Sequence, residues 1–222
     1  MIIAFDGNVF TGKTSLIKAL SVMTDSVVIN EHSDFLDAEV LNHDITSREA
    51  AISLQLKYLD AEERRCNRLK PNKMNLVDRS FVSMAAHIFA LNHIHGVDIR
   101  EWFLQEIQER IESKKVMIPD VFCFVKCERN IIIKRIHENN SRNTASTYYA
   151  GEYLDAIEYF NQNWADRVGS LTIDTDTILP IGLAKTLIQR ISVPCQGTFS
   201  TKQLYGYLRE LLMQEYTTQR RK

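Results

Sequence analysis

Residues 7–14 read Gly-Asn-Val-Phe-Thr-Gly-Lys-Thr, which is the G-x-x-x-x-G-K-[ST] pattern of a phosphate-binding loop, or P-loop. Gly7 and Gly12 let the backbone turn so that its amide groups point at an anion, and a helix starting near Lys13 adds its positive end. The pattern predicts that a nucleoside triphosphate with Mg²⁺ binds here, with Lys13 on the β- and γ-phosphates and Thr14 on the metal. The predicted binding residues are Gly7, Asn8, Val9, Phe10, Thr11, Gly12, Lys13, Thr14 and Ser15.

A carboxylate follows the second apolar run of the chain. Glu31 stands directly after residues 27–30, at the point where a strand is expected to end near the P-loop. It could accept a proton from a substrate hydroxyl, or hold a water molecule bound to Mg²⁺. The alternative is a solvated carboxylate in a turn.

A charged pair follows the third apolar run. Asp78 and Arg79 come after residues 74–77 and precede a helical pattern. An aspartate at a strand tip can bind Mg²⁺ directly or through water. The arginine beside it can clamp a phosphate or a substrate oxygen with two hydrogen bonds. The alternative is a helix cap in which Asp78 and Arg79 pair with each other.

Two arginines flank a polar stretch in the second half of the chain. Arg135 precedes it and Arg142 lies within residues 139–147, which read Asn-Asn-Ser-Arg-Asn-Thr-Ala-Ser-Thr. Such a segment buries little apolar area, so we expect a mobile lid over about residues 137–150. A lid bearing arginine would exclude water and neutralise charge on a transferring phosphoryl group. For each arginine the alternative is a solvated helix end.

The elements that position these groups alternate between strand and helix. Short apolar runs predict strands at Ile2–Asp6, Val27–Asn30, Asn75–Asp78, Val121–Val125 and Leu171–Asp174. Helical patterns include Lys13–Val22, Ser47–Leu69, Val82–Leu91, Ile99–Ser113, Glu128–Glu138 and Tyr149–Trp164. The alternation predicts a three-layer α/β fold, a five-stranded parallel sheet flanked by helices. Ligands are then expected beyond the carboxyl ends of the strands.

Composition sets the class of protein. The chain has 222 residues, of which 45% are hydrophobic and 25% charged, and its net charge is −1. These values predict one sizeable α/β domain over residues 1–192, and give no field that would attract nucleic acid or an anionic membrane. No apolar stretch is long enough to span a bilayer, and the N-terminal strand argues against a signal peptide. The four cysteines lack metal or redox spacing and are read as reduced thiols, which favours the cytoplasm.

The last part of the sequence, residues 193–222, is predicted to be an extension with a terminal helix over 200–216. Its apolar residues recur at helical spacing: Leu204, Tyr207, Leu208, Leu211, Leu212 and Tyr216. One interpretation is a helix docked on the domain. The other is a contact with a second copy of the chain, in a homodimer, or with another partner.

The order of these motifs resembles the thymidylate kinase and deoxynucleoside kinase branch of the P-loop kinases. The triplet Asp78-Arg79-Ser80 lies between the Asp-Arg-Tyr/Phe of thymidylate kinases and the Glu-Arg-Ser of deoxynucleoside kinases. Pro119-Asp120 matches the Pro-Asp that precedes the fourth strand in the family. The resemblance covers roughly residues 1–175, and the P-loop is its most specific part.

The resemblance implies roles for the residues that match. Lys13 and Thr14 would bind the phosphates of ATP and the Mg²⁺ ion, as P-loop residues do. Glu31 falls where deoxynucleoside kinases place their catalytic carboxylate. Asp78 and Arg79 fall where the group positions metal-bound water and substrate. The fold implied is that of a P-loop NTPase with an arginine-bearing lid.

Gln55, Arg135 and Arg142 also match family positions. Gln55 resembles the glutamine that reads the base in deoxynucleoside kinases, although an exposed helix glutamine is the alternative. Arg135 and Arg142 resemble lid arginines. Two departures concern the acceptor: His32 follows the carboxylate where proline is usual, and the arginine that holds a monophosphate in thymidylate kinases has no clear match. Its neighbourhood is occupied by Glu62, Arg64 and Arg65.

The sequence therefore predicts ATP- and Mg²⁺-dependent phosphoryl transfer to a nucleoside or nucleoside monophosphate. Two other classes remain open at this point. One is a P-loop kinase with a non-nucleotide acceptor, and the other is a regulatory nucleotide-binding protein of the ATPase or GTPase kind. A GTPase would carry an Asn-Lys-x-Asp motif, which the sequence lacks.

Overall fold

A computed structural model of the chain describes residues 1–37, 45, 47–138, 151–191 and 199–216. All five of its strands run parallel in one sheet, in the order β2-β3-β1-β4-β5. The expected α/β class and five-stranded parallel sheet are confirmed. The strands are β1 (Ile2–Asp6), β2 (Ser26–Ile29), β3 (Met74–Asp78), β4 (Val121–Lys126) and β5 (Leu171–Asp174).

The central strand β1 carries the chain into the P-loop. Its Phe5 lies beside Asp78 of β3, and its Asp6 lies beside Phe124 of β4. At the opposite end, the Asp120 carboxylate accepts a hydrogen bond of 2.6 Å from the Ile2 N–H, which aligns β4 with β1. The P-loop therefore starts between the carboxyl ends of two neighbouring strands, where ligands bind in parallel sheets.

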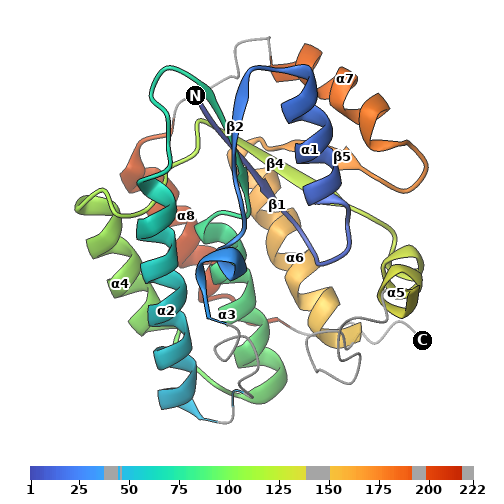
Figure 1. Cartoon of the computed structure of the whole chain (residues 1–222). Helices are drawn as coiled ribbons and strands as arrows, with labels where there is room; N and C mark the ends of the chain where they lie inside the picture. Colours follow the sequence, from blue (N-terminus) through green and yellow to red (C-terminus); the bar gives the residue numbers. More distant parts are fainter. Residues whose placement is uncertain (38–44, 46, 139–150, 192–198, 217–222) are drawn as a thin grey trace.

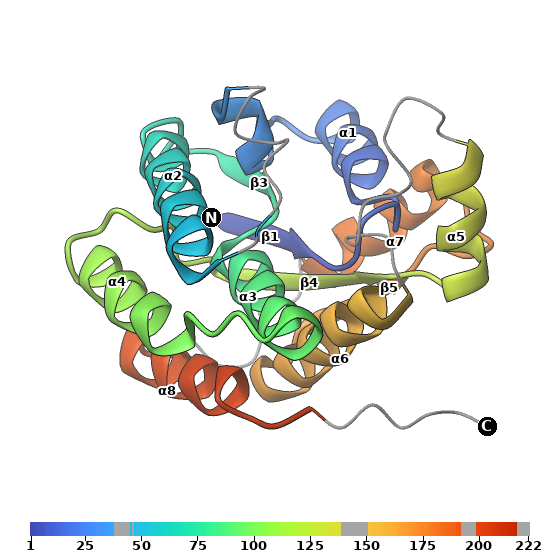
Figure 2. The ribbon, with the colours of Figure 1, turned by 90° about the horizontal axis from the view of Figure 1, so that it is seen from below.

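Helices cover both faces of the sheet (Figures 1 and 2). Along the chain they are α1 (Lys13–Met23), the short 3₁₀ helix η1 (His32–Phe35), α2 (Arg48–Cys66), α3 (Phe81–His95), α4 (Arg100–Glu112), α5 (Arg129–Glu138), α6 (Gly151–Val168), α7 (Pro180–Ile191) and α8 (Thr201–Leu212). Helices α1 and α7 pack together on one face, and α3 and α6 pack together on the other. The three layers match the expectation from the sequence.

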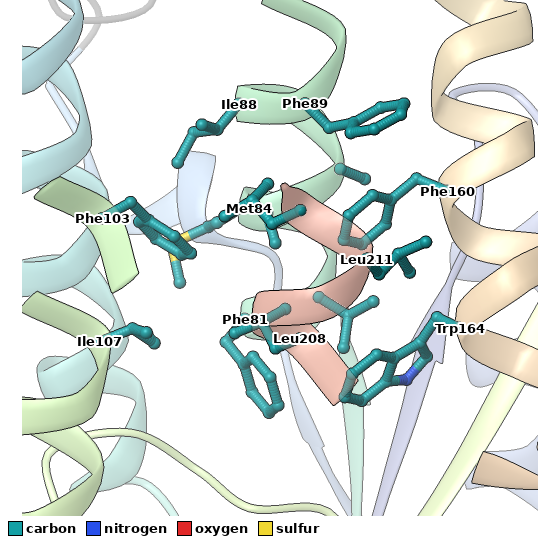
Figure 3. Packing of buried hydrophobic residues seen from close by; sticks show 14 of the residues in the cluster. Phe81, Met84, Ile88, Phe89, Phe103, Ile107, Phe160, Trp164, Leu208 and Leu211 are labelled. Atoms are coloured by element: carbon teal, nitrogen blue, oxygen red, sulfur yellow. The ribbon is translucent and has the colours of Figure 1, made fainter. Parts of the chain in front are cut away.

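Helix α8 completes the larger hydrophobic core. Its residues Leu204, Leu208, Leu211 and Leu212 are buried against α3, α4 and α6. Figure 3 shows Leu208 and Leu211 among the side chains of this core. A capping box starts the helix, in which the Ser200 hydroxyl accepts from the Gln203 N–H and the Gln203 side chain accepts from the Ser200 N–H. The docked interpretation of this helix is what the structure shows. A division of the chain at residues 192 and 193 stays a prediction.

Some helix boundaries differ from the sequence prediction. Helix α3 runs on to His95 because Gly96 ends it in the left-handed conformation, at φ 65°. Helix α2 stops at Cys66, three residues earlier than expected. Helix α7 was not expected, although Pro180 at its first position is a typical start signal. None of the helices that the structure describes combines the length and apolarity needed to span a bilayer.

Candidate active site

The P-loop joins β1 to α1 and needs glycine at its two motif positions. Gly7 has φ 140° and Gly12 has φ 91°, values that other residues rarely adopt. A Cβ atom on Gly7 would lie 2.2 Å from the backbone oxygen of Val125 in β4, so no side chain fits there. A Cβ atom on Gly12 would lie 3.9 Å from its nearest neighbours, so only the backbone conformation requires glycine at this position.

Side chains of the P-loop fix it to the surrounding elements. The Asn8 amide donates to the Leu154 carbonyl, at 3.0 Å, and to the Glu158 carboxyl of α6, at 3.1 Å. The Thr11 carbonyl accepts a 2.6 Å bond from the hydroxyl of Thr175, just after β5. The loop is thus held from two sides before any ligand binds.

Phe10 adopts a left-handed backbone conformation with φ 57°. With Val9, it packs against a small apolar cluster formed by Cys127, Ile132, Ile136 and Leu154. A bulky residue is therefore accommodated in the loop by contacts outside the turn. Its carbonyl oxygen accepts a 2.9 Å hydrogen bond from Arg135 of α5.

Lys13 is buried inside the loop. Its ammonium donates to the carbonyl oxygens of Gly7, at 3.1 Å, and of Asn8, and it lies 3.2 Å from the Thr11 hydroxyl. Burial, followed by the positive charge of Arg79, lowers the pKa of Lys13 to about 7. A bound anion would favour the charged form, so this lysine is suited to bind phosphate.

Thr14 and Asp78 face each other across the strand tips. The Thr14 hydroxyl donates to Asp78 Oδ2 at 2.6 Å. The other carboxyl oxygen, Asp78 Oδ1, is buried and has no hydrogen-bond partner among the described residues. Hydroxyl and carboxylate oxygens are the ligands that Mg²⁺ prefers, and the ion usually takes few of them from protein. The predicted metal residues therefore fit a Mg²⁺ ion.

Glu31 and Arg79 form an ion pair beside the P-loop. Arg79 Nε lies 3.0 Å from Glu31 Oε2, and Arg79 Nη1 donates to the Gly7 carbonyl at 3.1 Å. Burial alone would raise the pKa of Glu31, but the charge of Arg79 and hydrogen bonds from Ser33 and Arg79 bring it down to about 2. Glu31 is therefore a fixed, ionised carboxylate, and Arg79 pairs with it instead of with Asp78.

Arg135 reaches the P-loop, whereas Arg142 and most of the expected lid lie outside the described residues. Arg135 Nη1 contacts the Phe10 carbonyl at 2.9 Å and Cys127 Sγ at 3.3 Å, and Nη2 donates to the Thr175 carbonyl at 3.3 Å. The guanidinium thus sits at the back of the loop, where it adds positive charge near the phosphate site.

Gln55 is buried in α2 with 1% of its surface exposed, so the alternative of an exposed helix glutamine is wrong. Its Oε1 atom has no hydrogen-bond partner among the described residues. Tyr58 lies one turn along the same helix. Burial and then the negative charge of Glu31 raise the pKa of the Tyr58 phenol. Gln55 is thus a buried amide on the helix that also carries Tyr58.

Most of these groups line one cavity of about 750 Å³. Lys13, Thr14, Glu31, Arg79 and Arg135 all contribute to its wall, together with the segment 175–180 that leads into α7. Glu31 and the P-loop, which are separated by more than a dozen residues in sequence, therefore meet at one site. Gln55 and Asp78 are not among its lining residues.

Sequence reasoning missed several residues that support the site. The Asp6 carboxylate accepts hydrogen bonds from the Ser80 N–H (2.9 Å), the Ser80 hydroxyl (2.7 Å) and the Ser83 hydroxyl (2.6 Å). Asp6 is a charged residue at the end of an apolar run directly before the P-loop, and that position was an available signal. Thr175 and the segment leading into α7 carried no comparable signal.

The sequence matches the family model described as deoxynucleoside kinase over residues 3–190. No curated protein matches the chain. The matched region includes Gln55 of α2, and it includes the P-loop, Glu31, Asp78 and Arg79, which the structure gathers at the strand ends.

Solved structures share the fold. Deoxyadenosine kinase from M. mycoides with bound dCTP matches with a TM-score of 0.63 and 13% identity, over 86% of this chain and 99% of that one. The same enzyme with the products dCMP and dCDP gives a TM-score of 0.62 at 13% identity, over 86% and 99%. Thymidylate kinase from Candida albicans gives 0.56 at 13% identity, covering 92% of each chain.

Proposed function

The chain belongs to the deoxynucleoside kinase family, and we propose that it transfers the γ-phosphoryl group of ATP to a hydroxyl of a deoxynucleoside, with Mg²⁺ at the donor phosphates. Its class as a nucleoside or nucleotide kinase follows from the family and the kinase fold. One observation carries the proposal for the site: the ionised Glu31 and the P-loop lysine Lys13 line the same cavity.

The donor half of the reaction falls to the P-loop and its neighbours. The amides of residues 7–15 and the Lys13 ammonium would bind the β- and γ-phosphates at the start of α1. Arg135, on the far side of the loop, would neutralise charge that spreads over the transferring group. For Arg142, the same role stays a prediction from the sequence.

Thr14 and Asp78 would hold the Mg²⁺ ion. Two atoms support this assignment: the neighbouring Thr14 hydroxyl, and Asp78 Oδ1, which has no partner in the described part of the chain. When bound, the ion would offset the negative charge of the donor phosphates.

The acceptor half falls to Glu31 and Arg79. The hydroxyl oxygen of the deoxynucleoside would attack the γ-phosphorus while the bond from that phosphorus to the β,γ-bridging oxygen breaks and ADP leaves. Glu31 would orient the hydroxyl and accept its proton, and Arg79 would hold the acceptor oxygen. The charge of Arg79 and the hydrogen bonds from Ser33 and Arg79 hold the pKa of Glu31 well below its usual value, so the carboxylate is ionised and able to accept a hydrogen bond from the hydroxyl.

A nucleoside acceptor is favoured over a monophosphate by the positions of two arginines. Arg65 is completely buried, with its hydrogen bonds made inside the protein. Arg64 donates to the Phe35 carbonyl at 2.6 Å. Neither lines the cavity, so neither offers a second phosphate-binding cation there. This supports a kinase for a hydroxyl group of a nucleoside.

Gln55 would read the base of the acceptor. Its buried amide oxygen has no partner among the residues that the structure describes, and such an atom is costly unless a ligand satisfies it. A base edge offers both donors and acceptors to such an amide. The proposal also includes a cytoplasmic location, which is supported by the free thiols of Cys66 and Cys127.

Product analysis tests the proposed function. The protein is incubated with ATP, Mg²⁺ and a panel of deoxynucleosides and their monophosphates, and the products are identified by mass spectrometry. We expect deoxynucleoside monophosphate and ADP. Formation of diphosphates alone would instead assign a monophosphate acceptor, and free phosphate without a phosphorylated acceptor would overturn the kinase proposal.

Matched variants assign the residues. Lys13→Ala should abolish transfer, whereas Lys18→Ala, an exposed lysine on the same helix, should leave it intact. Glu31→Gln should lower kcat by about 100-fold or more, the range for loss of a general base. Gln55→Ala should raise KM for the preferred acceptor, and the exposed Gln105→Ala on α4 is its control.

A further inference from the structure

Three buried side chains lie between the tips of β2 and β3, and we call them the Arg65 cluster: His32 of η1, and Glu62 and Arg65 of α2. Their exposed fractions are 3%, 0% and 0%. Burying an arginine and a glutamate is costly unless each is paired and hydrogen-bonded.

Arg65 forms hydrogen bonds to oxygen with all three of its nitrogens. Its Nε donates to the Asn30 carbonyl at 2.8 Å, and its Nη1 donates to the Glu62 carboxylate. Its Nη2 donates to two further carbonyls, of Asp78 at 2.8 Å and of Arg79 at 2.7 Å. Asn30 directly precedes Glu31, so one guanidinium joins the backbone segments that carry Glu31 and the Asp78-Arg79 pair.

Glu62 and His32 hold this guanidinium in place. Glu62 Oε2 pairs with Arg65, and its Oε1 accepts from the Met117 N–H at 3.3 Å. The Nε2 atom of His32 lies 3.0 Å from Glu62 Oε2 and 2.8 Å from Arg65 Nη1. Burial and the charge of Arg65 lower the pKa of His32, so its ring stays neutral. The cluster therefore contains one positive and one negative charge, and it is internally compensated.

The cluster acts on a strained backbone position. Arg79 has φ 66°, a left-handed conformation that is rare for a residue other than glycine. Its N–H donates to the Phe5 carbonyl at 3.0 Å, and its own carbonyl accepts from Arg65. Such a conformation persists only where the surroundings hold it. It directs the Arg79 side chain to Glu31, as the 3.0 Å contact between them shows.

We propose that Arg65, held by Glu62 and His32, is a positioning residue that sets the relative placement of Glu31 and Arg79 for the acceptor hydroxyl. This role rests on the proposed function, and it adds to that function a buried residue that supports Glu31 and Arg79. Arg65 touches neither the cavity nor the P-loop in the described contacts. Its loss should therefore affect the chemical step more than donor binding.

Enzyme kinetics on the full chain test this role. The variants are Arg65→Met, which keeps bulk and removes the hydrogen bonds, and Arg65→Lys, which keeps the charge. Leu59→Ala, a fully buried change on the same helix, is the control for a loss of stability alone. For Arg65→Met we expect kcat to fall by about 10- to 100-fold, because a small misplacement of the reacting groups lowers the rate by this much. We expect the Kd of ATP to change by less than about threefold, and Arg65→Lys to recover only part of kcat.

A second readout does not need activity. The pKa of the Glu31 carboxyl is followed by ¹³C nuclear magnetic resonance, with Arg79→Met as the reference for a lost ion pair. The groups facing Glu31 are Arg79, Ser33, Lys13 and Tyr58. In Arg65→Met we expect the pKa to rise by about one unit or more, because Arg79 is no longer held against the carboxylate.

The outcomes separate this proposal from the proposed function. If Arg65→Met keeps kcat within twofold of wild type, the positioning role is wrong. The role is also wrong if kcat falls no further in Arg65→Met than in Leu59→Ala and the pKa of Glu31 stays unchanged. If wild-type protein phosphorylates no acceptor, the proposed function fails, and the Glu31 titration still decides the positioning role. If Arg65→Met does not fold, Glu62→Gln, which keeps the side-chain shape, is measured in the same two ways with the same criteria.

Discussion

The Thr14 hydroxyl and the Asp78 carboxylate are joined by a 2.6 Å hydrogen bond between the first turn of α1 and the tip of β3. The bond occupies one carboxyl oxygen and leaves the other, Asp78 Oδ1, buried without a partner among the described residues. Two oxygen-bearing side chains are thus already in contact before a ligand arrives. A metal ion would need little rearrangement to use both.

We predict that Asp78→Asn and Thr14→Ala remove the effect of Mg²⁺ on ATP binding. In wild-type protein Mg²⁺ should tighten ATP binding, whereas the variants should bind ATP equally with and without it. The kcat of Asp78→Asn should fall by at least about 100-fold, since metal ions supply several kcal/mol of charge stabilisation. Calorimetric titration with and without Mg²⁺ measures the affinities, and exposed Asp25→Asn is the control. An unchanged Mg²⁺ effect in Asp78→Asn would refute the metal assignment.

We predict that ATP binding takes up a proton at Lys13. The pKa of Lys13 is about 7 in the free protein, and bound phosphates raise it because they favour the charged form. Below pH 7 the lysine is already charged, so affinity should change little. Above pH 7 binding must protonate it, and affinity should fall by up to about tenfold per pH unit. Calorimetry at pH 8 in two buffers of different ionisation enthalpy counts the proton, and zero uptake would contradict the prediction.

We predict that His87 makes the protein less stable in mild acid. The ring contacts the Tyr153 hydroxyl, and burial, followed by the charge of Arg79, lowers its pKa from 6.5 to about 4. Because the unfolded chain binds this proton first, stability is present above pH 6.5 and is lost as pH falls toward 4. The loss should reach up to about 3 kcal/mol below pH 4. Urea unfolding at pH 7 and pH 5 should show a loss of about 2 kcal/mol from this group.

The histidine variants separate this effect from general acid sensitivity. His87→Gln should lose less stability between pH 7 and pH 5 than wild type, since it carries no titrating ring. The exposed His137→Gln should behave like wild type. Buried His32, whose pKa is also lowered, should keep part of the acid sensitivity in both variants. Equal losses in His87→Gln and wild type would show that this ring does not titrate as stated.

We predict that replacing Gly7 by alanine destabilises the protein more than replacing Gly12 by alanine. Gly7→Ala places Cβ 2.2 Å from the Val125 carbonyl, so strand β4 must move, at a cost of about 3 kcal/mol or more. Gly12→Ala meets no atom closer than 3.9 Å and should cost only about 1–2 kcal/mol for its conformation. Thermal unfolding compares them, and equal Tm values would contradict the steric argument.

Local patterns were sufficient to predict the sheet and the P-loop. Strands β1 and β5 begin and end where expected, because a short apolar run with polar ends is itself the signal of a buried strand. The glycine positions of the P-loop could be read because their backbone geometry permits no other residue. Glu31, Asp78 and Arg79 could be placed because parallel strands bring their carboxyl ends to one edge of the sheet.

The supporting contacts could not be predicted in the same way. Arg65 meets Asn30 and Asp78 across separations of 35 and 13 residues, and nothing in its local sequence distinguishes it from exposed Arg64. Gln55 lies in a helix whose polar residues gave no indication of which face is buried. These features depend on how elements pack after they form, which a single sequence does not encode in a short pattern.

Helix α8 also bears on how the protein is made. The apolar faces of α3, α4 and α6 that it covers are synthesised long before residues 201–212 (Figure 3). On the ribosome the sheet and the P-loop can form early, while this surface waits for the late helix. Until α8 is synthesised, the apolar side chains of α3, α4 and α6 that it covers lack this partner, and such surface makes a folding chain prone to aggregate.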